Sequence, residues 1–342
     1  MDSGFDRLRR GNCTLYIHKD FRDDIGHQTC GNNTAGVRNN IGQQTSGNDI
    51  GVVRDDIGQQ TSGNDIGVVR DDIGHQTCGN NTTSVRNDIF EQTLLAGKEE
   101  LHKRYHPTPV PSSKFTSVCK FIVRFGDVER VIYFKEYFCR STWDFVKHLF
   151  RPSRARRALK AALMLAANGF ESPAIIAMGQ CRFVFFTMRN FVATLEVESA
   201  RSVYQIIADK QYSPNTGQFR MKRSLAGSFG RTIGRMHAIG IFHGDLRLGN
   251  VLVRKEQDSW RFFFLDNERT KKFRRLPARL RLKNLVQINM FEPWLASDTD
   301  RMRFFKEYWA ENKKSKVEKA ALIKKVLKKT SRRLRKKQVL KL

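Results

Sequence analysis

The sequence predicts an α+β protein of two lobes, a small β-rich N-terminal lobe followed by a mainly helical C-terminal lobe. Two apolar runs flank Gly126-Asp127 and predict a β-hairpin early in the chain. Later, a helical pattern runs from Arg223 to Gly240 and is followed by a polar cluster between His243 and Asp266. With 40% hydrophobic residues and 25 Phe, the chain has enough apolar side chains for a core.

Before these lobes, the chain carries near-identical tandem repeats. An arginine recurs every 16 residues from Arg22 to Arg86, and each unit offers only Ile and Val among Gly, Asn, Asp, Gln and Thr. That apolar surface is too small to offset the entropy of ordering the segment. We therefore expect a disordered, repeat-containing N-terminal extension, with a small turn-rich β stack as the alternative.

The expected N-terminal lobe follows the loop marked by Pro107, Pro109 and Pro111. The runs CKFIVRF and ERVIYFKEYF predict two paired strands around Gly126-Asp127. The segment SRARRALKAALMLAANGF predicts a helix that is opened by Ser153 and closed by Gly169, and CRFVFFTM predicts a further strand.

The expected C-terminal lobe begins with the helix from Arg223 to Gly240. Short apolar runs at Val251–Val253 and Phe262–Leu265 predict paired strands around the polar turn Lys255–Ser259, and the chain beyond Lys271 is helical in pattern. One face of the first helix is apolar: Leu225, Phe229, Ile233, Met236 and Ile239.

The expected domain organisation has five parts. They are an N-terminal segment (1–21), the repeats (22–92), the N-lobe (93–190), the C-lobe with the polar cluster (191–312) and a basic amphipathic tail (313–342). In the tail, 14 Lys/Arg face a single Glu, and Ala320, Ile323, Leu327 and Leu334 recur at helical spacing. Such a helix is typical of attachment to an anionic membrane surface, although charge runs are more often solvated faces.

The polar cluster HGDLRLGNVLV, followed by FFFLDNERT, has the spacing of a phosphoryl-transfer site. A carboxylate must accept the proton of the attacking hydroxyl, and oxygen ligands must hold Mg²⁺ on the phosphates. Asp245 and Asn250 have the spacing of the base and a metal ligand in a kinase catalytic loop, and Asp266 ends the partner strand as the second metal ligand does. The order of elements around them predicts a protein-kinase-like fold.

Other residues can be assigned with less support. Arg247 stands where many kinases place a cation that touches the transferred phosphate, and His243 is interpreted as a loop anchor. Lys135, a lone charge in an apolar strand, is the candidate for holding the ATP phosphates, with Lys120 as the competing choice. The helix after it offers no carboxylate between Phe145 and Phe170, and no glycine-rich loop precedes the hairpin, so either a shorter turn or residues 107–113 would cover the phosphates.

The cysteines and the net charge limit the classes of protein to which the chain can belong. The six cysteines are scattered without a C-x-x-C pair, which argues against a zinc site and a disulfide framework and favours a reducing cytosol. The N-terminus lacks a signal-peptide core, and no apolar run reaches the length of a membrane span, so we expect a soluble or peripheral protein. The net charge is +28, and residues 1–90 are slightly acidic, so the rest of the chain favours an anionic partner.

HGDLRLGN together with Asp266 is similar to the aminoglycoside phosphotransferase class. Further segments narrow the choice of family: YFKEY, SRARRALKAALMLAANGFESP, LDNERT, KNLVQIN and SDTDRMRFFKEY. With them, the chain resembles the lipopolysaccharide kinase family from about Phe115 to Trp309. The resemblance implies ATP and Mg²⁺ as cofactors and a sugar hydroxyl of the lipopolysaccharide inner core, on Kdo or heptose, as acceptor. It implies a peripheral location at the cytoplasmic face of the inner membrane, and no specific nucleic acid partner is expected.

By the same resemblance, Asp245 takes the role of base, Asn250 and Asp266 hold the metal, and Lys135 contacts the nucleotide. Gly244 replaces the arginine of the kinase H-R-D pattern, so an activation loop read by that arginine is not expected. Two alternatives stay open: a kinase with a small-molecule or protein acceptor, and a non-catalytic basic binding module. Metal-dependent ATP turnover would separate the last from the others.

Overall fold

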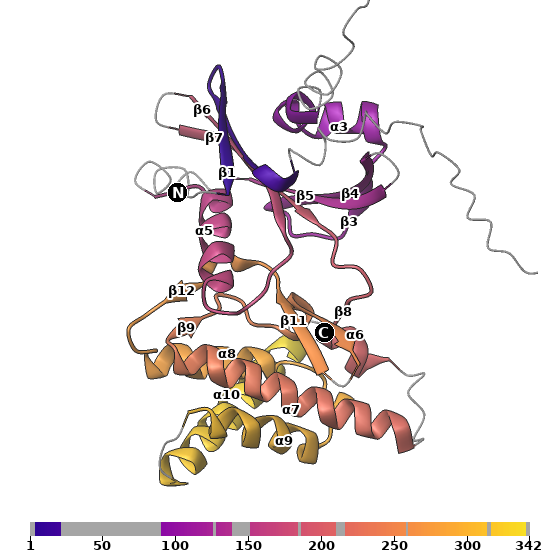
Figure 1. The fold of residues 1–342 in the computed structure, drawn as a ribbon. Coiled ribbons are helices and arrows are strands. Elements are labelled where there is room, and N and C mark those ends of the chain that lie inside the picture. The colour runs from indigo at the N-terminus through magenta and orange to yellow at the C-terminus, as the bar shows by residue number, and fades with distance from the viewer. Residues whose placement is uncertain are drawn as a thin grey trace, which may run out of the picture.

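The structure, a computed structural model, describes residues 4–21, 90–125, 128–138, 151–183, 186–209, 216–257, 259–312 and 316–339. The sheet with helices α3 and α5 forms one lobe, and helices α7 to α10 form the other (Figure 1). The predicted two-lobed α+β architecture is therefore confirmed. The repeats between residues 22 and 89 lie outside the described residues.

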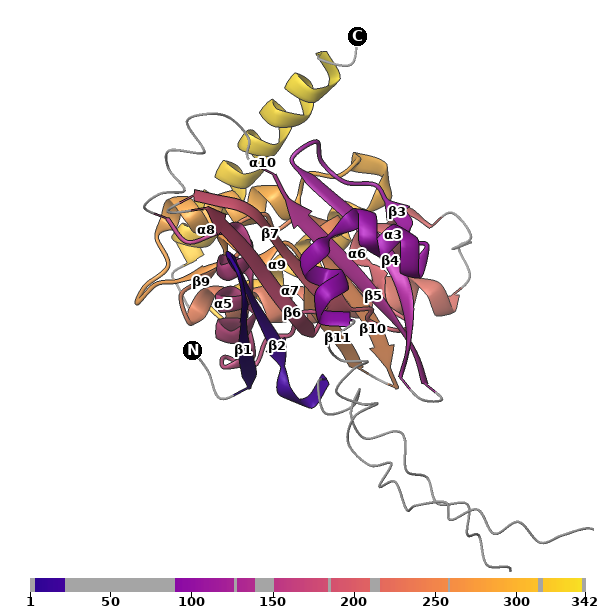
Figure 2. The ribbon, with the colours of Figure 1, turned by 90° about the horizontal axis from the view of Figure 1, so that it is seen from above.

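One seven-stranded antiparallel sheet, in the order β1-β2-β6-β7-β5-β4-β3, builds the N-lobe (Figure 2). The predicted hairpin forms as expected, with every residue of β4 paired to β5. The strands of the sheet are β1 (Phe5–Arg10), β2 (Cys13–His18), β3 (Thr108–Val110), β4 (Thr116–Phe125), β5 (Val128–Tyr137), β6 (Ile175–Phe183) and β7 (Phe186–Leu195).

Two predictions for this lobe need correction, one about a strand and one about a domain boundary. The run CRFVFFTM is not one strand: β6 ends at Phe183, β7 begins at Phe186, and these two residues pair across a chain reversal. The N-terminal segment is not separate from the lobe either, because β1 and β2 form a hairpin that joins the sheet through β6. The expected lobe boundary at residue 190 falls inside β7.

Helix α5 (Arg154–Ala166) forms where the sequence predicts it. Ser153 caps its N-terminus by accepting a hydrogen bond from the backbone N–H of Arg156 at 3.2 Å. Gly169 has a positive φ of 73°, the left-handed conformation that glycine adopts at helix ends. The helix packs on β6 and β7, and Arg154 in its first turn contacts Glu268 of the other lobe.

The C-lobe combines short strands with a helical layer. Its strands are β8 (Arg201–Ser202), β9 (Ile241–Phe242), β10 (Val251–Glu256), β11 (Ser259–Phe264) and β12 (Lys271–Lys272). Its helices are α6 (Val203–Ala208), α7 (Thr216–Ala238), α8 (Ala278–Ile288), α9 (Asp298–Ala310) and α10 (Lys316–Val339), and the N-lobe adds α3 (Lys98–Tyr105). Short 3₁₀ turns lie at η1 (Leu248–Asn250), η2 (Asn267–Arg269) and η3 (Pro293–Leu295).

Helix α7 places four of its five predicted face residues in the C-lobe core, whereas Ile239 is 41% exposed. Ile239 follows the last helical residue, so it no longer lies on the buried face. The paired strands β10 and β11 extend to Glu256 and Ser259, which makes the predicted polar turn shorter than expected.

An apolar cavity of about 140 Å³ lies among α7, α8, α9 and α10. Its wall includes Leu225, Phe229, Leu248, Leu285, Ile323 and Val326. Leu248 is the one of these that comes from the segment with the predicted catalytic residues.

Helix α10 corrects the expected membrane-facing stripe of the tail. It packs against α8, with Val326 and Thr330 buried, whereas Ala320 and Leu327 are exposed. The apolar side of the helix therefore belongs to the C-lobe core, and lysines and arginines cover its outward side. No helix among the described residues is long and apolar enough to cross a membrane.

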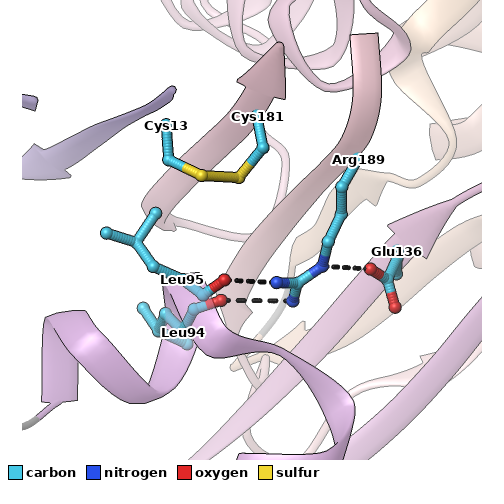
Figure 3. The surroundings of a disulfide bond; sticks show 6 residues. All are labelled: Cys13, Leu94, Leu95, Glu136, Cys181 and Arg189. Atoms are coloured by element: carbon cyan, nitrogen blue, oxygen red, sulfur yellow. Dashed lines mark hydrogen bonds and ion pairs between the residues drawn. A yellow bond between two sulfur atoms is a disulfide. The ribbon is translucent and has the colours of Figure 1, made fainter. Parts of the chain in front are cut away.

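Figure 3 shows how the first hairpin is fastened to the sheet. Cys13 of β2 and Cys181 of β6 are paired in the register and form a disulfide, which corrects the argument from cysteine spacing against disulfides at this one pair. The two cysteines are 168 residues apart in sequence, and the pairing of β2 with β6 brings them together. On the neighbouring strand, Arg189 pairs with Glu136 and donates to the carbonyls of Leu94 and Leu95, which ties residues 90–96 to the sheet.

The repeats enter and leave the lobe at neighbouring points. Phe21 precedes them, Phe90 follows them, and the two rings lie 6.0 Å apart by their centroids in the N-lobe core. Replacing residues 22–89 with a short Gly/Ser linker should therefore leave the melting temperature within about 2 °C of the wild-type value, because such a linker can join Phe21 to Phe90 without moving either ring. Differential scanning calorimetry measures this, and a fall of 10 °C would show that the repeats pack on the lobe.

Candidate active site

The predicted catalytic residues meet where the two lobes face each other. Asp245 and Asn250 lie on the loop between β9 and β10, and Asp266 follows β11. The two segments are held together because the backbone N–H of Leu265 donates to the carbonyl of Asn250 at 2.9 Å. From the N-lobe, Lys135 on β5 reaches across and forms an ion pair with Asp266.

This ion pair distinguishes Lys135 from Lys120. Lys135 is largely covered, with 25% of its side chain exposed, whereas Lys120 is on the exposed side of β4. Glu171, the one carboxylate near the end of α5, pairs instead with Arg261 at 2.6 Å. The partner of Lys135 is therefore the carboxylate that follows β11.

The loop is shaped by bonds to its own backbone. Asn250 donates its side-chain N–H to the carbonyl of Asp245 at 2.9 Å, which turns its amide so that the oxygen is the atom left for a cation. Asp266 has a φ of 56° and a ψ of 44°, a left-handed conformation that is rare for residues other than glycine. Strain of this kind is common at functional sites, where the surrounding structure holds it.

The carboxylate of Asp245 is held by two neighbours. It accepts a hydrogen bond from Gln287 Nε2 at 3.1 Å, and Arg247 Nε lies 3.0 Å from the same oxygen. Arg247 is 71% exposed, so its guanidinium can move toward an incoming phosphate. The structure thus brings Arg247 to the predicted base and leaves 31% of the Asp245 side chain exposed for a substrate.

His243 anchors the loop, as the sequence predicts. Its Nε2 lies 3.0 Å from the carbonyl of Leu265 and 3.1 Å from the side-chain oxygen of Asn267, and its Nδ1 accepts from the backbone N–H of Asp245 at 3.2 Å. Because Nδ1 accepts, the ring is the neutral form with the proton on Nε2. Complete burial lowers the pKa of His243, in keeping with that form.

Asn284 of α8 makes two hydrogen bonds to the backbone of His243. Its amide accepts from the backbone N–H of His243 at 3.2 Å and donates to the carbonyl of that residue at 2.6 Å. The same amide oxygen lies 3.2 Å from His237 Nε2, and the other ring nitrogen is 3.0 Å from Tyr308. Burial lowers the pKa of His237 to about 3, so the network is uncharged at neutral pH.

Gly244 occupies the position of the arginine in the kinase pattern, and the packing explains it. A Cβ at residue 244 would lie 2.1 Å from the Cβ of Arg269 and 2.9 Å from its backbone. Any side chain there would push η2 away from the catalytic loop. The glycine thus allows the backbone after Asp266 to pack directly beside Asp245.

Arg154 at the start of α5 fastens the helix to η2. Its Nε and Nη2 donate to the two carboxylate oxygens of Glu268 at 2.9 and 3.0 Å, and both side chains are more than 90% buried. Its Nη1 donates to the carbonyl of Phe115 at 3.2 Å, and its guanidinium lies 4.6 Å from the ring centre of Tyr137. The helix therefore contributes a cation to the segment after Asp266, and contributes no carboxylate to Lys135.

Replacing Arg154 with Met should destabilise the protein by about 3–5 kcal/mol, because the carboxylate of Glu268 would stay buried without its cation. Urea denaturation followed by tryptophan fluorescence measures the free energy of unfolding. The double variant Arg154→Met with Glu268→Met should recover part of the loss. If the single and double variants lose the same free energy of unfolding, the loss does not come from leaving Glu268 buried without a cation.

Asn284, Gln287, Arg154 and Glu268 were not predicted as site residues. Asn284 and Gln287 have a signal in the sequence, because two amides three residues apart lie on the same side of α8, among Leu285, Val286 and Ile288. The pairing of Arg154 with Glu268 has none, since it joins residues 114 positions apart.

Residues 107–113 are one of the two segments considered for covering the phosphates of ATP. Of residues 107–113, Thr108–Val110 form β3, at the edge of the sheet beside β4. The turn that follows is closed by Ser112 Oγ, which donates to the carbonyl of Thr116 at 2.8 Å, and Thr116 pairs with Tyr137, two residues after Lys135. This turn therefore lies at the Lys135 end of β5.

Comparisons with known proteins identify the family of the chain. The model of a family described as Lipopolysaccharide kinase (Kdo/WaaP) family matches residues 117–333. The chain belongs to this family. Among solved structures, the chain is similar to one titled "WaaP in complex with acyl carrier protein", with 18% identity and a TM-score of 0.50 over 71% of this chain and 95% of that chain. The comparison with curated sequences gave no match.

Membership in this family makes the protein a kinase, and a kinase uses ATP. The structural likeness supports the protein-kinase-like fold. The lipopolysaccharide kinase resemblance drawn from the sequence is confirmed.

Proposed function

We propose that the protein transfers the γ-phosphate of ATP to a sugar hydroxyl of the lipopolysaccharide inner core, on Kdo or heptose. The observation that carries this proposal is the meeting of Asp245, Asn250, Asp266 and Lys135 at one point between the lobes, in a chain of this family. The reaction would take place at the cytoplasmic face of the inner membrane, where a lipid-anchored acceptor is within reach.

The donor atoms present fit Mg²⁺. An amide oxygen of Asn250 and a carboxylate of Asp266 are hard oxygen ligands, and no group of three or more His, Cys, Asp or Glu able to hold a metal occurs among the described residues. Two protein oxygens are too few to hold the ion alone, which matches a cation that is shared with nucleotide phosphates. When bound there, Mg²⁺ would neutralise charge on the transferred phosphoryl group.

Lys135 would serve the phosphates from the other lobe. Lys135 pairs with Asp266, and a phosphate of ATP would share its ammonium group with that carboxylate. The ion pair also holds β5 over the segment after β11. Lys135 would thus position both the nucleotide and Asp266.

Asp245 would act as the base that orients the acceptor hydroxyl and accepts its proton. Gln287 fixes the carboxylate through one oxygen, at 3.1 Å, and the other oxygen is the one available to the substrate. Arg247 would leave Asp245 for the transferred phosphate, because its exposed guanidinium matches phosphate geometry. The exchange of partners would free the base as the phosphate arrives.

The acceptor proposed here is anionic, and the basic charge of the chain after residue 90 suits it. A lipopolysaccharide core glycolipid carries its negative charge in a membrane whose surface is also anionic. The outward side of α10 is covered by exposed lysines and arginines, and we propose that it is attracted to that surface. No specific nucleic acid is needed to explain the charge.

Mass spectrometry of the core oligosaccharide from cells with and without the gene tests the acceptor. Expression of the wild-type protein should add the mass of one phosphate group, and expression of the Asp245→Asn variant should not. An unchanged oligosaccharide, alongside Mg²⁺-dependent ATP turnover by the purified protein, would favour a small-molecule or protein acceptor. Absence of both would favour a non-catalytic basic module.

Neutralising the outward side of α10 should weaken binding to anionic vesicles about tenfold or more, since each basic side chain near such a surface adds about 1 kcal/mol. The exposed residues Lys325, Lys328, Lys329 and Arg332 are suitable for replacement with Gln. Removing the whole tail would be a poor test, because it would also remove Val326 and Thr330 from the core. Vesicle sedimentation at low salt measures the binding, and equal binding by the fourfold variant would contradict the attachment.

A further inference from the structure

Three arginines from two elements meet at Glu268. Arg154 binds its carboxylate, Arg157 Nη1 lies 3.5 Å from its backbone carbonyl, and Arg269 Nε lies 3.7 Å from its carboxylate. Arg154 and Arg157 come from the first turn of α5, and Arg269 ends η2. A fourth guanidinium, that of Arg151, lies within electrostatic range of Arg157. We call Arg151, Arg157 and Arg269 the arginine cluster.

The carboxylate of Glu268 does not balance these positive charges. Both oxygens of Glu268 are already bound by Arg154. Arg157 makes one long bond to a carbonyl, and its buried Nε has no hydrogen-bond acceptor within the described part of the chain. Burial and the neighbouring Arg151 lower the pKa of Arg157, as expected for a cation that lacks enough compensating charge. An anion would supply that charge and the missing acceptors.

Through Arg269, the arginine cluster reaches the loop that carries the base. Arg269 packs its backbone against Gly244, the residue before Asp245, and its guanidinium is about half exposed. Lys135, Asp266 and Asn250 already provide the cation and the metal ligands for the phosphates of ATP. The arginine cluster is therefore left for a second negative group, which the acceptor would bring.

We propose that the arginine cluster is an anion subsite for a carboxylate or phosphate group of the acceptor, next to the hydroxyl that Asp245 deprotonates. The proposal rests on the proposed function for the identity of the acceptor. The subsite selects an acceptor that carries a negative group near the reacting hydroxyl, and it rejects neutral sugars. Its guanidinium groups suit the planar or tetrahedral oxygens of such groups.

Binding of inorganic phosphate tests the subsite without any turnover. Phosphate should raise the melting temperature of the wild-type protein above its value in chloride at equal ionic strength. The rise should be at least halved in Arg157→Gln and in Arg269→Gln, and should persist in Arg223→Gln, which removes the same charge from the exposed side of α7. An equal rise in all four proteins would overturn the subsite.

Kinetics then identify which substrate the subsite serves. For Arg269→Gln, the KM for the core glycolipid should rise about tenfold or more, the usual size for loss of a charged hydrogen bond, while the KM for ATP stays within about twofold. With an acceptor from which carboxylates are reduced and phosphates removed, wild type and variant should have the same KM. A rise in the KM for ATP instead would assign the arginines to the nucleotide and overturn the proposal.

The two readouts separate this inference from the proposed function. If the protein does not phosphorylate the core glycolipid, phosphate binding still decides whether the arginine cluster holds an anion. If it does phosphorylate the glycolipid, but Arg157→Gln and Arg269→Gln bind phosphate and acceptor as the wild type does, the function stands and the subsite is wrong. Arg269→Gln changes an exposed side chain, so its folding is not at risk.

Discussion

Replacing Asp245 with Asn is expected to lower the rate of phosphoryl transfer by about 10³-fold, within the range for removal of a general base. The amide has the same shape and can still accept the bond from Gln287, so the loop should keep its conformation. It cannot accept the hydroxyl proton. Transfer of labelled phosphate from ATP to the core glycolipid measures the rate, and binding of an ATP analogue should be nearly unchanged.

The matched control is Asp300→Asn, which changes an aspartate of α9 that is paired with Arg303 at 2.9 Å. That variant should keep the wild-type rate, because its carboxylate belongs to a helix surface. Transfer at the wild-type rate by Asp245→Asn would remove Asp245 from the chemistry. A loss of ATP-analogue binding would instead assign Asp245 to the nucleotide.

Replacing Lys135 with Met should lower kcat/KM for ATP by about 10²–10³-fold, because one charge that is aimed at the phosphates is lost. Lys120→Met on the neighbouring strand removes the same charge from an exposed position and should change little. The comparison controls for the general effect of charge on anionic substrates. A larger loss of kcat/KM in Lys120→Met would mean that the nucleotide binds at Lys120 on β4 and not at Lys135 on β5.

Lys135→Met also removes the cation that faces Asp266. The freed carboxylate is partly exposed and can be hydrated, so the fold should tolerate the change. Circular dichroism should therefore be unchanged in the variant. Loss of secondary structure would mean that the ion pair holds the lobes together, and the kinetic result would then need a second substitution, Lys135→Arg, which keeps the charge.

The catalytic loop was predictable because its signal is local. The spacing of Asp245, Asn250 and Asp266 follows from one loop and one strand pair, and the structure places them together as the spacing requires. Lys135 was predictable for a similar reason, since a lone charge in an apolar strand needs a partner. What the sequence could not provide was the identity of that partner, because Asp266 is 131 residues away.

The missed features depend on contacts between distant segments. The first hairpin, FDRLRR-GN-CTLYIH, joins the sheet through pairing with β6, and its charged first strand masks the alternation that marks a half-buried strand. The run CRFVFFTM conceals a chain reversal because apolar residues continue through it. The disulfide depends on that same pairing of β2 with β6, so the spacing of the cysteines alone could not reveal it.

The close approach of Phe21 and Phe90 has a consequence for how the gene can vary. The chain that joins them is 68 residues long, and for a flexible segment the entropic cost of bringing the two ends together grows only with the logarithm of its length. Gain or loss of one 16-residue unit would change that cost by about 0.2 kcal/mol, well below the scale on which folded proteins are selected. Copy number can therefore drift between lineages while the enzyme beside it keeps the same stability.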